Sequence, residues 1–310
     1  MEKSFIGYKK GDSKLVLTMP HSATVVPEGL KHNVNLEDEV VKRTVNGGVD
    51  LCVPFVTEFH EQEKHARIWS EIPRAILDMH RLSTDLDYKA CEGKERGKSD
   101  PHGLVWIATV ENDPSKMKRM LKKPYSLEEL ESLISNYHEY VGSINQAMRN
   151  AKSKHGMAIQ FDLHSMPARI PGLIKEGEYK NGYLDRGPAR RGIDLSKGEL
   201  PDLILLDKGD QICDPAISEI VMTIFREYGL SIGKMLVRAV DTPSAYSLFA
   251  NKQERKYCLG VEIVGHTFEP KRTEGELVYD PTDVEKYTNA FREVFSSLSN
   301  FEESLLSQRE

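Results

Sequence analysis

The sequence predicts an α/β fold built around a mainly parallel sheet. Short apolar runs typical of strands alternate, along the 310 residues, with longer segments whose apolar residues recur at helical spacing. Several of these runs stop abruptly at polar residues, as strands do at the edge of an open α/β sheet. The length suits one large domain or two closely joined ones. We expect a single domain over residues 1–310.

Seven apolar runs are interpreted as strands, whereas the charged segment Glu58–Ser70 is expected to be a loop or an edge. The predicted strands are Lys14–Met19, Val53–Phe59, Arg74–Met79, Met157–Pro167, Leu203–Leu206, Ser231–Val240 and Cys258–Val264.

Four segments carry helix signals. The clearest is the capping box of Ser126 and Glu129, which opens a helix predicted to run to about Lys154. Stop signals at glycines also support two of the other helices. These three segments are Val34–Val45, Pro215–Tyr228 and Thr282–Leu306, the last capped near Asp283.

Two segments are expected to be loops. Lys89–Pro101 is rich in Lys, Glu, Gly and Ser and should be exposed. Residues 169–200 are rich in Gly, Pro and charged residues without clear periodicity, so we expect either a long loop that covers the functional site or a partly disordered segment.

Composition excludes several classes of protein. The net charge is −6 with acidic and basic residues interspersed, so no nucleic-acid partner is expected. No apolar run is long enough to span a membrane, and the polar N-terminus does not resemble a signal peptide, so we expect a cytoplasmic protein with a small-molecule substrate. The four cysteines form no CxxC pair and are interpreted as buried, reduced thiols. The oligomeric state is not predicted.

Polar residues at the ends of four predicted strands indicate a functional site. Each has an ordinary structural explanation, such as a surface histidine or a structural ion pair. In a mainly parallel sheet, however, such strand ends converge on one crevice. The residues are His21, Asp78 with Arg81, Asp162 with His164, and Glu262.

These residue types point to metal-assisted amide hydrolysis. Two histidines and a carboxylate are a common catalytic zinc set. A nearby Glu can carry a proton from water to the leaving amine, and an Arg can bind a substrate carboxylate. The sequence lacks HExxH, so a helix-borne zinc protease is excluded. We expect Zn²⁺, although Ni²⁺, Co²⁺ or Mn²⁺ could replace it.

The order of the motifs resembles the N-formylglutamate amidohydrolase family over roughly residues 14–285. The most specific piece is DxHSMP after an apolar strand. The motifs are Pro20-His21-Ser22 with Pro27, Val49-Asp50, Asp78-x-x-Arg81 with Asp85 and Asp87, Asp162-x-His164-Ser165-Met166-Pro167, and Val261-Glu262-Ile263.

The resemblance implies a three-layer α/β/α sandwich around a mixed, mainly parallel sheet, like that of zinc carboxypeptidases and aspartoacylases. It implies hydrolysis of a small N-acyl acidic amino acid such as N-formylglutamate. By this resemblance, His21 and His164 are zinc ligands, Arg81 clamps a substrate carboxylate, and Glu262 is the general base.

The sequence departs from the family pattern around the substrate. Ala23, His80 and Val264 replace the usual Gly, Asn and Asn, and Thr24 stands where related enzymes carry a metal-binding Glu. We therefore expect the third ligand to be Asp50, with Glu28 as the alternative.

The remaining site residues are assigned supporting roles. His80 and Ser165 are expected to contact the substrate, and Asp162 and Asp78 to orient the metal-binding residues from behind. Two other functions stay open: a carboxypeptidase-like hydrolase of peptides or cell-wall fragments, and a non-catalytic binding protein with the same fold.

Overall fold

The computed structural model of the chain describes residues 4–23, 25–47, 50, 65–94, 97, 101–109, 114–166, 201–235, 247–264, 271–273, 276–278 and 280–301. The predicted strand Val53–Phe59, the predicted covering loop 169–200 and the end of the predicted strand Ser231–Val240 lie outside these residues.

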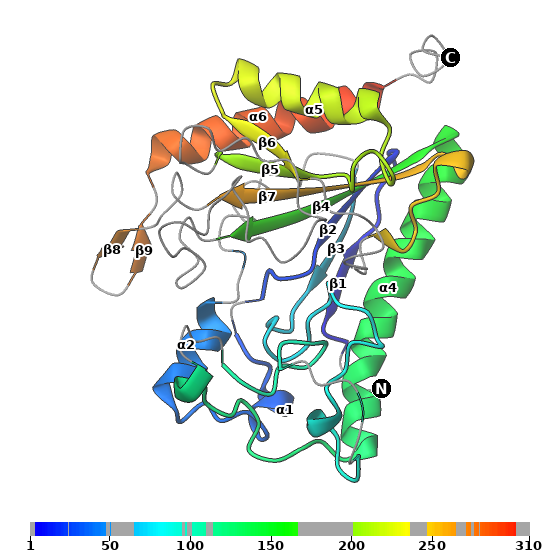
Figure 1. The fold of residues 1–310 in the computed structure, drawn as a ribbon. Helices are drawn as coiled ribbons and strands as arrows, with labels where there is room; N and C mark the ends of the chain where they lie inside the picture. Colours follow the sequence, from blue (N-terminus) through cyan, green and yellow to red (C-terminus); the bar gives the residue numbers. More distant parts are fainter. Residues whose placement is uncertain are drawn as a thin grey trace.

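A seven-stranded sheet forms the centre of the molecule, in the order β1-β3-β2-β4-β7-β5-β6 (Figure 1). Four neighbouring pairs are parallel, whereas β1 is antiparallel to β3 and β5 is antiparallel to β7. This confirms the predicted mixed, mainly parallel sheet. The strands are β1 Ile6–Lys9, β2 Leu15–Met19, β3 Ala66–Ser70, β4 Ala158–Met166, β5 Leu203–Leu206, β6 Ile232–Met235 and β7 Lys256–Val264.

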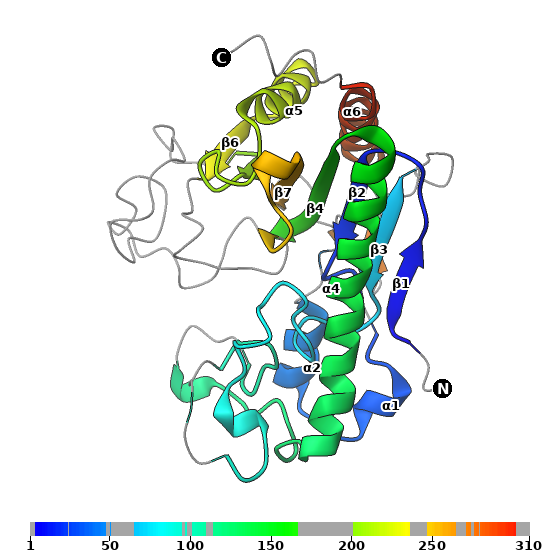
Figure 2. The same ribbon diagram turned by 90° about the vertical axis from the view of Figure 1, so that its right-hand side faces the viewer.

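Helices cover both faces of the sheet and complete the predicted α/β/α sandwich. Helix α4 (Leu127–His155) packs on one face, while α5 (Pro215–Glu227) and α6 (Pro281–Asn300) pack on the other (Figures 1 and 2). Successive side chains of a strand point to opposite faces. In β4, Phe161 and Leu163 therefore join the core beneath α5 and α6, and the intervening residues face the α4 side.

The helix ends show why these segments fold as predicted. Ser126 and Glu129 form the predicted capping box of α4, and Gly156 ends that helix with a left-handed φ of 75°. The cap predicted near Asp283 is Asp280, which accepts a hydrogen bond from the Thr282 N–H at 2.9 Å and so begins α6. Pro281 then occupies the first helical position, where its missing N–H costs nothing.

Smaller elements complete the described structure. They are the helices α1 (Glu28–Lys31) and α2 (Glu39–Gly47), three short 3₁₀ turns, and a separate hairpin of β8 (Lys271–Thr273) and β9 (Glu276–Val278). Among the described residues, no helix combines the length and apolar character needed to cross a membrane.

Two predictions about the segment before the site are wrong. The apolar run Arg74–Met79 is not a strand. Its backbone turns back, with the Ile76 and Leu77 N–H groups donating to the Pro73 carbonyl, while Ala75, Ile76 and Leu77 are fully buried. The charged stretch before it does contain a strand, β3, in which buried and half-buried residues alternate. The apolar residues of 74–79 indicated burial but not a strand. In β3, the alternation of buried and half-buried residues was the sign of the strand.

The first predicted helix is also shorter than expected. It begins at Glu39, because the Asp38 carboxylate accepts hydrogen bonds from the N–H groups of Val40 and Val41 and so starts the helix there. Val34, which was predicted to open the helix, instead forms an isolated bridge with Leu121.

The cysteines within the described residues agree with the prediction of buried, reduced thiols. Cys91, Cys213 and Cys258 are all free and buried. Cys52 lies outside the described residues.

Candidate functional site

The candidate site lies at the carboxyl ends of three adjacent parallel strands, β2, β4 and β7. His21 follows the end of β2 by two residues, and His164 lies near the end of β4. Glu262 of β7 is the direct register partner of His164, so the two side chains share a face of the sheet. The sheet thus brings together three of the four predicted polar strand ends, whereas Asp78 reaches His21 from a turn that was predicted as a strand.

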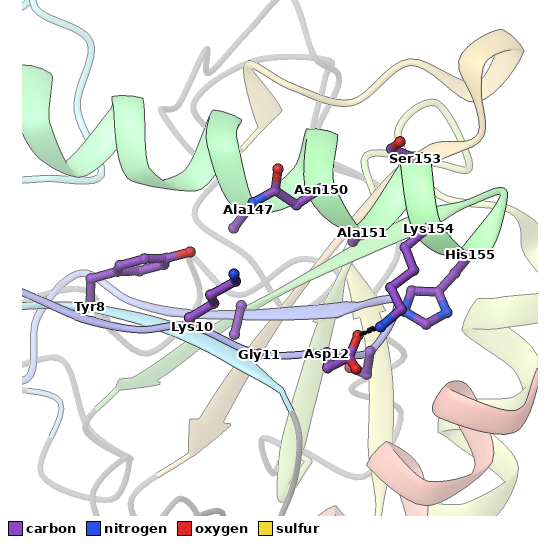
Figure 3. A pocket seen from close by; sticks show the side chains of 12 residues that line it. Tyr8, Lys10, Gly11, Asp12, Ala147, Asn150, Ala151, Ser153, Lys154 and His155 are labelled. Atoms are coloured by element: carbon purple, nitrogen blue, oxygen red, sulfur yellow. Dashed lines mark hydrogen bonds and ion pairs between the residues drawn. The ribbon is translucent and has the colours of Figure 1, made fainter.

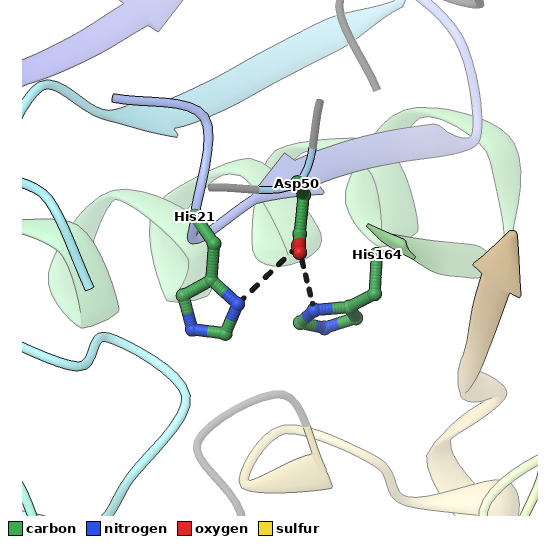
Figure 4. A group of neighbouring side chains, drawn as sticks. All are labelled: His21, Asp50 and His164. Atoms are coloured by element: carbon green, nitrogen blue, oxygen red, sulfur yellow. Dashed lines mark hydrogen bonds and ion pairs between the residues drawn. The ribbon is translucent and has the colours of Figure 1, made fainter. Parts of the chain in front are cut away.

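Three buried donor atoms form the centre of the site. Asp50 Oδ2 lies 3.3 Å from His21 Nδ1 and 3.2 Å from His164 Nδ1 (Figure 4). All three atoms lie within 4.8 Å of one another, and the three residues are at most 3% exposed. The backbone also joins this group, because the Asp50 N–H donates to the His21 carbonyl at 2.9 Å.

The donor set and its spacing fit a divalent ion such as Zn²⁺. Nitrogen and carboxylate oxygen are normal zinc ligands, and two ligands at about 2.0–2.1 Å from one tetrahedral ion lie about 3.3 Å apart. His21 Nδ1 is buried and forms no hydrogen bond within the described residues, although it faces Asp50. A metal ion would give this nitrogen a partner.

A second carboxylate stands behind each histidine. Asp78 Oδ1 lies 2.8 Å from His21 Nε2, and Asp162 Oδ2 lies 2.7 Å from His164 Nε2. When the outer nitrogen of an imidazole donates to a carboxylate, the inner nitrogen keeps its lone pair for a metal. Both histidines therefore present Nδ1 to the same point.

Two arginines surround Asp78, only one of which was predicted. Arg74 Nε donates to Asp78 Oδ2 at 2.9 Å, and its guanidinium lies over the Trp106 ring, 5.6 Å from the ring centroid. Arg81, the predicted clamp, is more loosely placed: its Nε is 3.8 Å from the same oxygen and its side chain is 37% exposed. Arg74 lies four residues before Asp78 in a segment predicted as a strand, so the sequence pattern did not indicate this pair.

His80 lies beside His164 at the edge of the site. The two ring centroids are 4.7 Å apart, and His80 Nε2 is 3.9 Å from Asp162 Oδ2. His80, Asp162 and His164 form a second group whose atoms are close enough to share an ion. In the second group, His164 faces Asp162 through Nε2 at 2.7 Å, a nitrogen already engaged by that carboxylate, so the first group is the better metal site.

Burial and neighbouring charges shift the pKa values in opposite directions. Burial raises the pKa of Glu262 above its ordinary value, although the charge of His164 opposes this effect. Burial would likewise raise the pKa of Asp50, but His21 and His164 outweigh it and hold the pKa below its ordinary value. Glu262 is therefore the more basic of these two carboxylates.

The pKa values of the other histidines and carboxylates of the site are shifted as well. Burial would lower the pKa of His164, but the adjacent Asp162 raises it well above its ordinary value. Burial would raise the pKa of Asp78, but the charges of Arg74 and His21 hold that pKa well below its ordinary value. Burial, together with His164 and His21, lowers the pKa of His80, which is then neutral at pH 7.

Sequence reasoning missed a row of buried polar residues behind Asp162. The Thr18 hydroxyl donates to Asp162 Oδ1, Gln160 Nε2 donates to Thr18 Oγ1 at 3.2 Å, and Cys258 Sγ donates to Gln160 Oε1 at 3.3 Å. A signal was present, because Gln160, Asp162 and His164 are spaced by two and must share one face of a strand.

Two predicted residues are placed away from the centre. Glu28 lies on α1 with a side chain 87% exposed and paired with Lys31, so Asp50 joins the histidines and Glu28 does not. Ser165 follows His164 in β4, and strand alternation turns its side chain to the opposite face.

A cavity among the described residues lies at the other end of the parallel strands. It has a volume of about 670 Å³ and lies between the residues before β2 and the C-terminal half of α4 (Figure 3). Lys154 and Asp12 form an ion pair on its wall. None of the residues that line it was predicted to be functional.

Comparisons with known proteins show which family the sequence matches. A family model described as N-formylglutamate amidohydrolase matches residues 13–243. The N-formylglutamate deformylase of Pseudomonas aeruginosa is 21% identical over 213 residues. That match covers 69% of this chain and 66% of the relative, so it spans slightly less than two thirds of the relative's length.

Two solved structures share the fold. The N-formylglutamate amidohydrolase of Ralstonia eutropha aligns with a TM-score of 0.71 at 18% identity, covering 96% of this chain and 100% of that one. A gene product of Agrobacterium tumefaciens aligns with a TM-score of 0.55 at 9% identity, covering 96% of this chain and 97% of that one.

Proposed function

Because the chain belongs to the N-formylglutamate amidohydrolase family, we propose that it hydrolyses the amide bond of a small N-acyl acidic amino acid, with an N-formylglutamate-like compound as substrate. One observation carries the metal-dependent part of this proposal: His21 Nδ1, Asp50 Oδ2 and His164 Nδ1 converge, and each histidine is backed by its own carboxylate.

His21, Asp50 and His164 would hold a divalent ion, with Zn²⁺ the first choice from the donor types and other divalent metals possible. When bound, such an ion activates water and polarises the amide carbonyl. Asp78 and Asp162 keep the two imidazole rings oriented from behind.

Glu262 is proposed as the general base. It lies beside His164 on the neighbouring strand, is partly exposed to solvent, and has a raised pKa that makes its carboxylate a better proton acceptor than that of Asp50. Its carboxylate takes a proton from the attacking water and then delivers a proton to the leaving amine.

Arg81 and His80 are proposed to bind the substrate. Both side chains are partly exposed, at 37% and 23%, and both belong to the turn that carries Asp78. A guanidinium binds a carboxylate through two parallel N–H donors, which selects for acidic substrates. Neutral His80 offers one ring N–H donor, in the position where the family carries an Asn side chain. Ser165, which points to the other face of β4, is proposed to contribute less.

The experiment is a metal-and-substrate assay on the purified full chain. Bound metal is quantified by mass spectrometry, and hydrolysis is measured on N-formylglutamate, N-formylaspartate, N-acetylglutamate, N-formylleucine and short peptides. We expect one equivalent of metal, loss of activity with a chelator, and preference for the acidic N-formyl compounds.

Glu262→Gln separates catalysis from binding. We expect it to retain the metal and lose about 10²- to 10⁴-fold in turnover. Glu254→Gln is the matched control, because Glu254 is an exposed residue just before the same strand. Preference for peptides would favour a carboxypeptidase-like enzyme instead, and stoichiometric metal without hydrolysis of any compound would favour a binding protein.

A further inference from the structure

We propose that Thr18 and Gln160 are positioning residues that hold Asp162, and through it His164, in the orientation that presents His164 Nδ1 to a metal ion. This inference rests on the proposed function only in requiring that the site binds a divalent metal. It assigns roles to two residues that touch neither the metal ligands nor the substrate directly.

The sheet register places these residues in one buried row. Thr18 of β2 is the register partner of Asp162, and Val16 is the partner of Gln160. Thr18 and Gln160 are fully buried, and Asp162 is 1% exposed. Leaving a buried polar group without a partner costs about 1–3 kcal/mol, so these groups are held in the hydrogen bonds that they make.

With Gln160 oriented as it is in the structure, the hydrogen bonds in this row run from Gln160 through Thr18 to Asp162. Thr18 Oγ1 accepts from Gln160 Nε2, so its single proton is free to donate to Asp162 Oδ1. Asp162 then accepts on both oxygens, from Thr18 and from His164 Nε2. A histidine that donates through Nε2 keeps the lone pair on Nδ1 for a metal.

The Gln160 amide sets the direction of the whole row. Its Oε1 accepts from Cys258 Sγ, which leaves Nε2 to face Thr18. The opposite orientation would place an acceptor against the Thr18 hydroxyl and draw its proton away from Asp162. Asp162 has no Lys or Arg within 4.0 Å among the described residues, and the neutral Thr18 hydroxyl donates to it in addition to the histidine.

The test measures the affinity of the full-length protein for Zn²⁺ by competition with a chromophoric chelator. Thr18→Val removes the hydroxyl with little change in shape, and we expect it to weaken Zn²⁺ binding by about 10- to 100-fold. Thr18→Ser restores the donor and should bind within about threefold of wild type. The matched control is Thr109→Val, which removes another fully buried threonine hydroxyl, one that accepts from the Lys118 N–H outside this row.

A double-mutant cycle tests whether Gln160 acts through Thr18. Gln160→Met alone should weaken Zn²⁺ binding by a smaller factor than Thr18→Val, and it should add nothing in the Thr18→Val background. Thermal unfolding with a chelator present checks that each variant is folded. If Thr18→Val fails to fold, the proposal is tested by comparing the Zn²⁺ affinities of Gln160→Met and Thr18→Ser with that of the wild type.

The outcomes separate this inference from the proposed function. Wild-type affinity in both Thr18→Val and Gln160→Met, with hydrolysis intact in the wild type, overturns the positioning roles alone. Equal weakening by Thr109→Val and Thr18→Val also overturns them, because the effect would then be general destabilisation. A wild-type protein that binds Zn²⁺ but hydrolyses nothing removes the proposed function, and the affinities still decide the positioning roles.

Discussion

The site has two arms that look alike near the metal position and differ behind it. We call Asp78–His21 the His21 arm and Asp162–His164 the His164 arm. In both, a buried carboxylate contacts Nε2 at 2.7–2.8 Å and leaves Nδ1 facing Asp50. Behind the carboxylates, Asp78 is supported by the guanidinium of Arg74, and Asp162 by the neutral hydroxyl of Thr18.

The difference follows from the elements that carry each arm. Asp162 and His164 lie on one face of β4, so the sheet already aligns them and a neutral hydrogen bond suffices. Asp78 lies in a turn, where it is held by the charge of Arg74 and by the backbone N–H of His80 at 3.0 Å. In this site, the carboxylate in the turn is held by a cation, whereas the carboxylate on the strand is positioned by the sheet and by a neutral hydroxyl.

The largest effect is expected from removing a histidine of either arm. His164→Ala and His21→Ala should each abolish stoichiometric metal binding and turnover, because two ligands are left in place of three. Metal content and hydrolysis are measured on the same preparation. His32→Ala is the control, since His32 is an exposed residue beyond α1. Full turnover in His164→Ala would contradict the assignment of the site.

The next largest effect is expected from removing the cation that supports the His21 arm. Arg74→Met leaves Asp78, which is fully buried, without its guanidinium, and should lower the free energy of unfolding by about 3 kcal/mol. Urea unfolding of the chelator-treated protein measures this. Arg226→Met removes an exposed ion pair and should cost less than about 1 kcal/mol. Equal losses in the two variants would mean that Arg74 is not the anchor of its arm.

In the metal-free protein, the way the free energy of unfolding changes with pH should be set largely by the His164 arm. Asp162 raises the pKa of His164 above its unfolded value of about 6.5, so the resulting stability is present below that pH and is lost as pH rises through the folded value. We expect wild type to lose more stability between pH 6 and pH 9 than Asp162→Asn does, as measured by urea unfolding at each pH. Parallel curves for the two proteins would rule this out.

The smallest effect is expected from the neutral support. Thr18→Val should lower the free energy of unfolding by about 2 kcal/mol, less than Arg74→Met, because the hydrogen bonds to Asp162 and Gln160 are lost and no cation is removed. The same urea experiment compares the two variants directly. A larger loss in Thr18→Val than in Arg74→Met would reverse the comparison between the arms.

Several parts of this protein were predictable because their signals are local. The capping box at Ser126 and the apolar run before Asp162 each depend on a few neighbouring residues, and both were confirmed as α4 and β4. Local signals gave wrong predictions where an apolar segment is buried without being a strand, and where a strand lies in a charged segment. Ala75, Ile76 and Leu77 are apolar and fully buried, yet their segment turns back on itself, and Ala66–Ser70 is a strand despite its charged surroundings.

By itself, the sequence determined which residue types could do chemistry and that His21, His164 and Glu262 stand at or near strand ends, because periodicity and composition depend only on neighbours in the chain. Only the tertiary structure decided which residues meet. It placed Asp50, rather than Glu28, between the histidines, paired Arg74 with Asp78, and set Thr18 against Asp162 across 144 residues of sequence separation. These contacts depend on strand order and register, which arise when distant segments pack together to bury their apolar faces.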